Sequence, residues 1–132
     1  MKEQINSPLD TSSGILTIGA VARSLNVHSR TLRIYDELGL LVPKRSEGDR
    51  RLYSLNDVEK AKFIMFLTRN LAINLAGVKV ILAILDKLSV KPSEYFNFIN
   101  PVVKHTDIDL KAQDVNIKKA KNKGRKPKNP KI

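Results

Sequence analysis

Two short segments with helical spacing of apolar residues, separated by a very short break, constrain the fold of this chain more than any other feature. In the first segment, "TIGAVARSL", the apolar residues that recur on one helix face are Ile18, Val21, Ala22 and Leu25. Thr17 is suited to cap this helix, because its hydroxyl can accept a hydrogen bond from a free amide. A break at residues 26–27 follows.

The second segment, "HSRTLRIYDELGLL", predicts a helix over residues 29–38. Leu32 and Tyr35 can face the first helix, and Gly39 supplies the left-handed conformation that ends many helices. Two short helices with so tight a connection predict a helix-turn-helix.

A short two-stranded ribbon is predicted after the second helix. The stretch "LLVPKRSEGDRRLY" runs from apolar residues through Pro43 and a Glu-Gly-Asp turn, and then returns to Leu52 and Tyr53. Four basic side chains flank the turn, namely Lys44, Arg45, Arg50 and Arg51. Glu47 and Asp49 offset part of this charge.

Further helices are predicted after the ribbon. Ser54 and Asp57 have the spacing of a capping box, which opens a helix that continues to about Leu71. Asn74 can cap a fourth helix in "LAGVKVILAILDKL", and "SEYFNFI" is expected to add one or two turns before Pro101. The predicted fold is therefore mainly α, with a ribbon after the helix-turn-helix and additional C-terminal helices.

The charge of the chain is large and unevenly distributed. The 132 residues carry a formal charge of +11 with a pI of about 10.0, which favours nucleic acid over an acidic membrane surface as the partner. Residues 104–132 hold ten Lys or Arg and three Asp, and their final part, "KKAKNKGRKPKNPKI", has scarcely any apolar residues, so they predict a disordered basic tail. Residues 1–14 predict a disordered leader, and the ordered part of the chain is expected over residues 15–103.

Several kinds of site are excluded or disfavoured by the residues that the sequence lacks. The absence of cysteine excludes disulfides and thiolate metal sites, and two histidines argue against a histidine-rich metal site. Without a secretory-type apolar run or a membrane-length apolar stretch, a cytoplasmic, nucleoid-associated protein is expected. Asp36 and Glu37 lack a neighbouring histidine or a glycine-rich phosphate loop, so no enzyme and no cofactor is predicted.

The second helix and the ribbon carry the candidate DNA-binding residues. Arg30 and Arg33 are three residues apart and share a face opposite Leu32, and arginine can pair bidentately with guanine in the major groove. His28 and Ser29 lie where the free amides of the helix N-terminus attract phosphate. The basic ribbon can then bind the backbone of the duplex beside this helix.

Each of these assignments has a plain structural alternative. The arginine pair can be a solvated surface with ion pairs to Asp36 or Glu37, and the ribbon can be a merely soluble hairpin. The ring of Tyr35 can pack in the core with or without its hydroxyl reaching a phosphate. The basic tail can add phosphate contacts or only improve solubility.

The segment "LTIGAVARSLNVHSRTLRIYDELGLLVPKRSEGDRRLYSLNDVEKAKFI" resembles the winged helix-turn-helix DNA-binding domain of MerR-type transcription regulators. "TIG-VA", "TLR-Y", "GLL-P-R" and "R-YS--D" occur in that family's order, and the ribbon corresponds to the wing. The resemblance covers residues 15–88 and implies a winged helix domain there, followed by a short extension over residues 89–103. His28 before "TLR" and the later "NLAGVKVIL" are most similar to the heat-shock repressors of the HspR type.

This resemblance implies a homodimer that binds an inverted-repeat operator in double-stranded DNA. At matching positions the recognition helix contributes Arg30, Thr31, Arg33 and Tyr35, and the wing contributes Arg45, Arg51 and Tyr53. Arg50 falls where the family often has an aromatic or small residue. In the heat-shock subgroup a chaperone acts as co-repressor, which is an implication of the resemblance alone.

The function predicted from these features is that of a sequence-specific transcription regulator. A repressor is favoured because the long coiled coil of family activators is not evident after Pro92. The alternative is an architectural or excisionase-like protein that bends DNA. The fourth helix has a second apolar stripe that a partner can cover, and the residues that seal this helix within the subunit or across a dimer are Tyr95, Phe96, Phe98, Ile99, Val102 and Val103.

Overall fold

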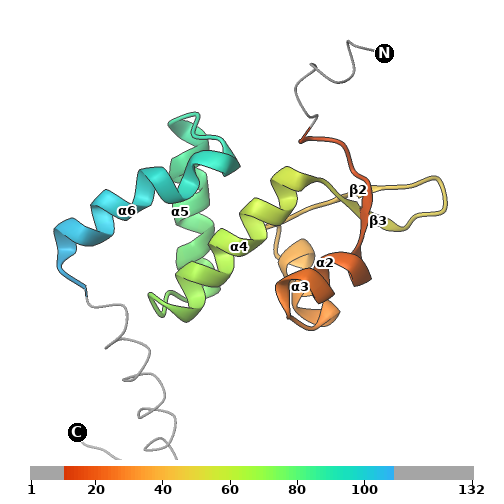
Figure 1. Cartoon of the computed structure of the whole chain (residues 1–132), viewed down its shortest axis with the longest axis horizontal. Coiled ribbons are helices and arrows are strands. Elements are labelled where there is room, and N and C mark those ends of the chain that lie inside the picture. The colour runs from red at the N-terminus through yellow and green to blue at the C-terminus, as the bar shows by residue number, and fades with distance from the viewer. Residues whose placement is uncertain (1–10, 109–132) are drawn as a thin grey trace, which may run out of the picture. The chain divides into compact units, whose positions relative to one another are not determined.

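The structure of the protein, a computed structural model, describes residues 11–108. Residues 1–10 of the predicted leader (residues 1–14) and residues 109–132 of the predicted tail (residues 104–132) lie outside these residues, and the first three residues of that predicted tail belong to a helix. The chain divides into two compact units, residues 1–62 and residues 63–132, and Figure 1 shows their elements. No helix within residues 11–108 is both long and apolar enough to cross a membrane.

The first unit contains the predicted helix-turn-helix. Helix α2 (Ile18–Leu25) begins at Thr17, whose hydroxyl accepts a hydrogen bond from the Ala20 amide at 3.2 Å, and it ends at Asn26 in the left-handed conformation. Helix α3 (Ser29–Glu37) follows, and Gly39 has a φ of 75° just after it. Both helix predictions are confirmed to within one residue.

The two helices pack through small apolar faces. Val21 and Ala22 of α2 are buried, as are Leu32 and Tyr35 of α3. These are positions that the apolar spacing predicts to face inward. The remaining side of α3 is therefore left for polar side chains.

The sheet of this unit has three strands, whereas the sequence predicted two. Strands β2 (Lys44–Arg45) and β3 (Arg51–Tyr53) form the predicted ribbon, and β1 (Leu16–Thr17) pairs antiparallel with the other side of β3. The Ile15 amide extends this pairing by donating to the Tyr53 carbonyl at 3.1 Å. A two-residue strand is too short to show alternation, so its partner rather than its own sequence defines it.

Helix α4 (Leu55–Arg69) begins with the predicted capping box. The Ser54 amide donates to Asp57 Oδ2 at 2.9 Å, and the Asp57 amide donates to Ser54 Oγ at 3.0 Å. The Asn56 amide also donates to the Thr11 carbonyl at 2.9 Å. This last bond attaches the first residues that the structure describes to the start of α4.

The second unit contains the C-terminal helices. Helix α5 (Leu75–Lys87) starts at Asn74, whose Oδ1 accepts from the Gly77 amide at 2.8 Å, as predicted. A single 3-10 turn, η1 (Pro92–Glu94), leads into α6 (Tyr95–Thr106). The expectation that helical structure ends before Pro101 is wrong, because α6 continues through this proline.

Packing within the second unit explains why α6 continues. The ring of Phe63 lies 4.9 Å from that of Tyr95 and 5.3 Å from that of Phe96, and Val103 beyond the proline is buried. Pro101 removes one helical hydrogen bond, but burial of apolar side chains on both sides of it favours the continuous helix. The aromatic side chains at the start of α6 thus pack inside their own unit.

Candidate nucleic-acid interface

Helix α3 presents two arginines on its outer side. Arg30 and Arg33 are exposed, whereas Leu32 between them is fully buried. Within residues 11–108 neither guanidinium forms an ion pair or a hydrogen bond, so the alternative of ion pairs to Asp36 or Glu37 is not seen in this helix. Both cations are therefore accessible to an anionic partner.

The start of α3 is capped by His28. Its Nδ1 accepts a hydrogen bond from the Arg30 amide at 3.2 Å, which requires that this nitrogen carries no proton. The Thr31 amide donates to the His28 carbonyl at 2.9 Å, and the side chains of Ser29 and Thr31 are half-buried. The Arg30 amide, one of those predicted to be open to phosphate, is therefore already hydrogen-bonded to His28.

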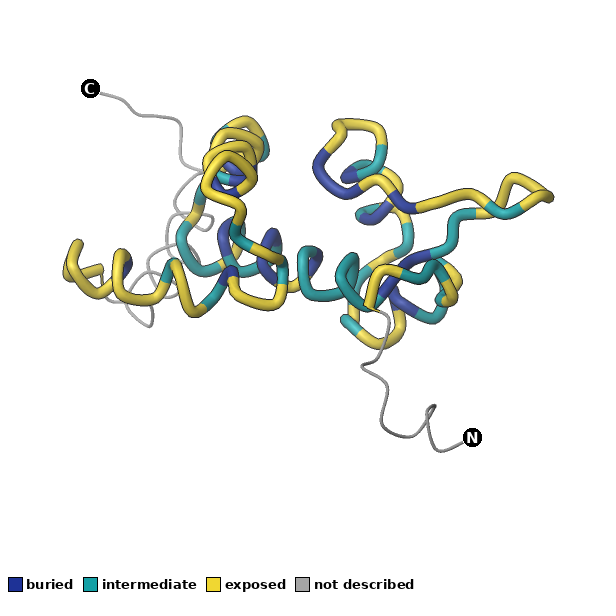
Figure 2. The backbone as a smooth tube through the Cα atoms, turned by 90° about the horizontal axis from the view of Figure 1, so that it is seen from above, coloured by how far each residue is buried: buried dark blue, intermediate teal, exposed yellow. Residues whose placement is uncertain are grey.

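A tight turn joins the two strands of the ribbon. The Asp49 amide donates to the Ser46 carbonyl at 2.9 Å, and the Arg50 amide donates to Ser46 Oγ at 3.1 Å. Asp49 has a φ of 62°, a left-handed conformation that aspartate tolerates better than most residues. The turn residues are largely exposed in Figure 2.

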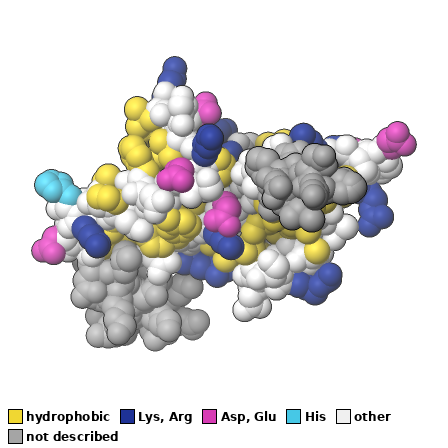
Figure 3. Space-filling view, turned by 45° about the horizontal axis from the view of Figure 1, so that its top comes forward, with side chains coloured by type: hydrophobic (Ala, Val, Ile, Leu, Met, Phe, Trp, Pro, Cys, Tyr) yellow, Lys and Arg dark blue, Asp and Glu magenta, His cyan; other side chains and the backbone are white. Residues whose placement is uncertain are grey.

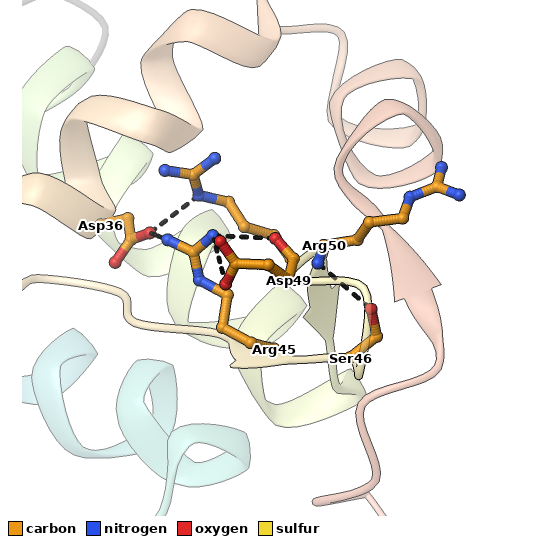
Figure 4. A network of polar contacts seen from close by, with 6 residues as sticks. Asp36, Arg45, Ser46, Asp49 and Arg50 are labelled. Atoms are coloured by element: carbon orange, nitrogen blue, oxygen red, sulfur yellow. Dashed lines mark hydrogen bonds and ion pairs between the residues drawn. The ribbon is translucent and has the colours of Figure 1, made fainter.

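The basic side chains of the ribbon are held in different ways. Lys44 and Arg50 are exposed, and Figure 4 shows the Arg50 guanidinium directed away from Asp36. Arg51 Nε instead donates to Asp36 Oδ2 at 2.8 Å, and Arg45 Nη2 lies 3.4 Å from the same oxygen. The ribbon therefore joins α3 through one carboxylate.

Arg45 has a second acidic partner in the turn. Its Nη1 donates to the Asp49 carbonyl at 3.2 Å and lies 3.7 Å from Asp49 Oδ1. The sequence suggests ion pairs between Asp36 and the arginines of its own helix, but Asp36 instead contacts the ribbon. The sequence carries no local signal for this contact, because Arg51 lies 15 residues from Asp36.

Two tyrosines that were predicted to contact DNA are buried. Tyr35 is 5% exposed and Tyr53 is 0% exposed. Burial raises the pKa of the Tyr53 hydroxyl, which has no hydrogen-bond partner among the residues that the structure describes. The structure thus places Tyr53 beneath the basic surface and not on it.

Charge on the molecular surface is mixed. In Figure 3 the Lys and Arg side chains are spread over the face drawn, with Asp and Glu side chains between some of them. In the described part of the chain, no group of three or more histidine, aspartate and glutamate side chains lies close enough together to hold a metal ion. The exposed cations of α3 and the ribbon suit an anionic ligand and lie together in the first unit.

Comparison with known proteins identifies the family. Residues 16–84, which include the helix-turn-helix, the ribbon and most of α5, match the family described as MerR HTH family regulatory protein. The chain belongs to this family. The resemblance found in the sequence is confirmed, and a MerR family of regulatory proteins agrees with the prediction that the chain is not an enzyme.

Individual members of the MerR family show the extent of the similarity. The chain is 35% identical to the heat shock protein HspR of Streptomyces coelicolor over 81 residues, which are 61% of this chain and 54% of HspR. It is 38% identical to the transcriptional regulator GlnR of Bacillus anthracis over 71 residues, 54% of each protein. The aligned part thus spans about half the length of these two relatives.

A third relative is matched over more of its length. The mercuric resistance operon regulatory protein of Bacillus cereus is 30% identical over 99 residues, which cover 74% of this chain and 73% of that protein. This alignment is longer than the segment that the family match covers.

Proposed function

We propose that the protein is a sequence-specific transcription regulator, a repressor, that binds double-stranded DNA through α3 and the ribbon. The observation that carries the proposal is the exposure of Arg30 and Arg33 on the side of α3 opposite the buried Leu32. A helix with this arrangement can enter the major groove without disturbing its own core. Membership in the MerR family supports the same function.

The contacts divide into those that read bases and those that bind the backbone. We assign Arg30 and Arg33 to base edges, and the exposed Lys44 and Arg50 to phosphates. Ser29 and Thr31, at the start of α3, are assigned to the backbone beside the groove. Tyr35 stays assigned to a phosphate through its hydroxyl, with its ring in the core, whereas Tyr53 is not assigned a contact because its hydroxyl is fully buried.

We also propose that the protein binds as a homodimer on an inverted repeat. One short helix reads few bases, so a specific site usually requires two such modules. Val80 and Ile84 of α5 and Leu88, which caps its C-terminal end, recur every four residues and are 59%, 50% and 55% exposed. An apolar stripe of this kind suits a second copy of the same surface.

The repressor assignment is supported by the length of the helices after α4. Those within the described region, α5 and α6, have 13 and 12 residues. They are much shorter than the long coiled coil that the MerR resemblance associates with activators. Action on chromosomal DNA would place the protein in the nucleoid of the cytoplasm.

Selection of a duplex from random sequence, followed by footprinting and light scattering, tests this function. We expect a protected inverted repeat that overlaps a promoter, with two chains bound per site. Strong bending at sites away from promoters would support the architectural alternative instead. Adding a heat-shock chaperone to the complex tests the co-repressor that the HspR resemblance implies, and tighter operator binding is the expected result.

A further inference from the structure

A single carboxylate on α3 holds both strands of the ribbon. Asp36 Oδ2 accepts from Arg51 Nε of β3 at 2.8 Å and lies 3.4 Å from Arg45 Nη2 of β2 (Figure 4). The side chain of Asp36 is only 12% exposed, and those of Arg51 and Arg45 are 21% and 43% exposed. The junction is therefore partly protected from water.

The position of Asp36 is unfavourable by local rules. It lies in the last turn of α3, where the helix dipole disfavours a negative charge, and no basic residue occupies that turn. Arg45 and Arg51 are directly paired across the two strands, where like charges repel each other. The contact with Asp36 relieves both of these problems, and residues that break local rules in this way are often functional.

The contact with Asp36 also makes the guanidinium groups of Arg45 and Arg51 less available to DNA phosphates. An arginine whose guanidinium is engaged by a carboxylate is less available to a phosphate than an unpaired one, and phosphate contacts provide affinity for any DNA sequence. Arg30 and Arg33 on the same helix have no such partner within the described chain. Asp36 thus offsets part of the positive charge of the ribbon, whereas Arg30 and Arg33, which are assigned to base edges, keep no carboxylate partner in the described chain.

We propose that Asp36 is a positioning residue that raises sequence specificity by fixing the ribbon on α3 and withholding Arg45 and Arg51 from indiscriminate phosphate binding. This inference rests on the proposed DNA-binding function. With Asp36 in place, the ribbon is held at a fixed distance from the bases that α3 contacts, so its phosphate contacts form only in that register. Without it, the two arginines can bind phosphates on any duplex.

The test compares Asp36→Asn with Glu37→Gln. Both variants remove one negative charge from the last turn of α3, but Glu37 is exposed and forms no ion pair in the described structure. Dissociation constants are measured for the full chain on the selected duplex and on a scrambled duplex of equal length, across a series of salt concentrations.

For Asp36→Asn we expect scrambled-duplex binding to tighten about three- to tenfold and the ratio of the two dissociation constants to shrink accordingly. The slope of log affinity against log salt should steepen by ~0.9 for each new phosphate contact. Glu37→Gln should change both dissociation constants by the same small factor. Equal ratios and equal slopes in the two variants would overturn the proposal.

Two further variants separate positioning from a general loss of structure. Asp36→Glu keeps the carboxylate and should restore much of the specificity ratio. Adding Arg45→Gln to Asp36→Asn should remove part of the gain in scrambled-duplex binding, and a gain that persists in full would count against the proposal. If Asp36→Asn does not fold, Arg51→Gln serves instead, and an unchanged ratio in that variant would overturn the inference.

Binding by the wild-type protein distinguishes failure of the proposed DNA-binding function from failure of the role proposed for Asp36. If it binds the selected duplex no more tightly than the scrambled one, the proposed function itself fails. If it discriminates between the duplexes and Asp36→Asn discriminates equally well, only the role of Asp36 fails.

Discussion

Arg30 and Arg33 of α3 and two of the three ribbon arginines are the same residue type on neighbouring elements, yet the two pairs differ in how they are held. Arg30 and Arg33 are exposed and form no ion pair in the described structure, whereas Arg45 and Arg51 contact Asp36. Unpaired arginines can adapt to a base edge, and paired ones are already oriented. Under the proposed function, this difference assigns base reading to α3 and positioning to the Asp36 contact of the ribbon.

The largest effect should come from removing the unpaired arginines. Arg33→Ala should weaken operator binding and Arg30→Ala should relax base preference, each by about 1–3 kcal/mol if the side chain contacts a base. Titration of the selected duplex measures this loss. Arg69→Ala, which removes an exposed arginine from the last turn of α4, is the control and should bind normally. Normal binding by both α3 variants would remove α3 from the recognition surface.

A smaller effect, on stability, should separate the two paired arginines. Arg51→Ala loses a short and partly buried hydrogen bond to Asp36, so we expect the free energy of unfolding to fall by about 1–2 kcal/mol. Arg45→Ala loses longer and more exposed contacts and should cost less than about 1 kcal/mol. Urea unfolding followed by circular dichroism measures both losses. A larger loss in Arg45→Ala than in Arg51→Ala would contradict the assignment of the stronger contact to Arg51.

The His28 cap of α3 should contribute about as much to the free energy of unfolding as an ordinary N-cap. His28→Ala removes the acceptor of the Arg30 amide, and we expect a loss of about 0.5–1 kcal/mol in the free energy of unfolding. His28→Asn keeps a capping oxygen and should restore the stability. If DNA binding weakens in both variants while the stability of His28→Asn is normal, the imidazole itself contacts DNA.

The smallest effect should come from Tyr53→Phe. The Tyr53 hydroxyl is buried without a hydrogen-bond partner in the described region, so its removal should leave stability unchanged or slightly higher. Operator affinity should also be unchanged, because the side chain does not reach the surface. A tenfold weaker complex at normal stability would show that Tyr53 becomes a DNA contact when the operator binds.

Features that depend on neighbours in the chain could be predicted from the sequence. Thr17, Asn74 and the Ser54–Asp57 pair cap helices through bonds that span three residues, and the apolar spacing of α3 predicts its buried and exposed sides. The residue types at these positions are sufficient, because the hydrogen-bond partner lies within one helical turn. The assignment of Arg30 and Arg33 to DNA is still a proposal, but their exposure follows from spacing alone.

Other features depended on contacts between residues far apart in the chain. Strand β1 exists through its pairing with β3, and α6 passes Pro101 while its aromatic side chains pack on Phe63 of α4. Arg51 lies 15 residues from Asp36, and only the folded ribbon brings the two together. The sequence by itself thus determined the local elements and which arginines face outward. The tertiary structure decided which arginines are paired, because that depends on how distant segments approach one another.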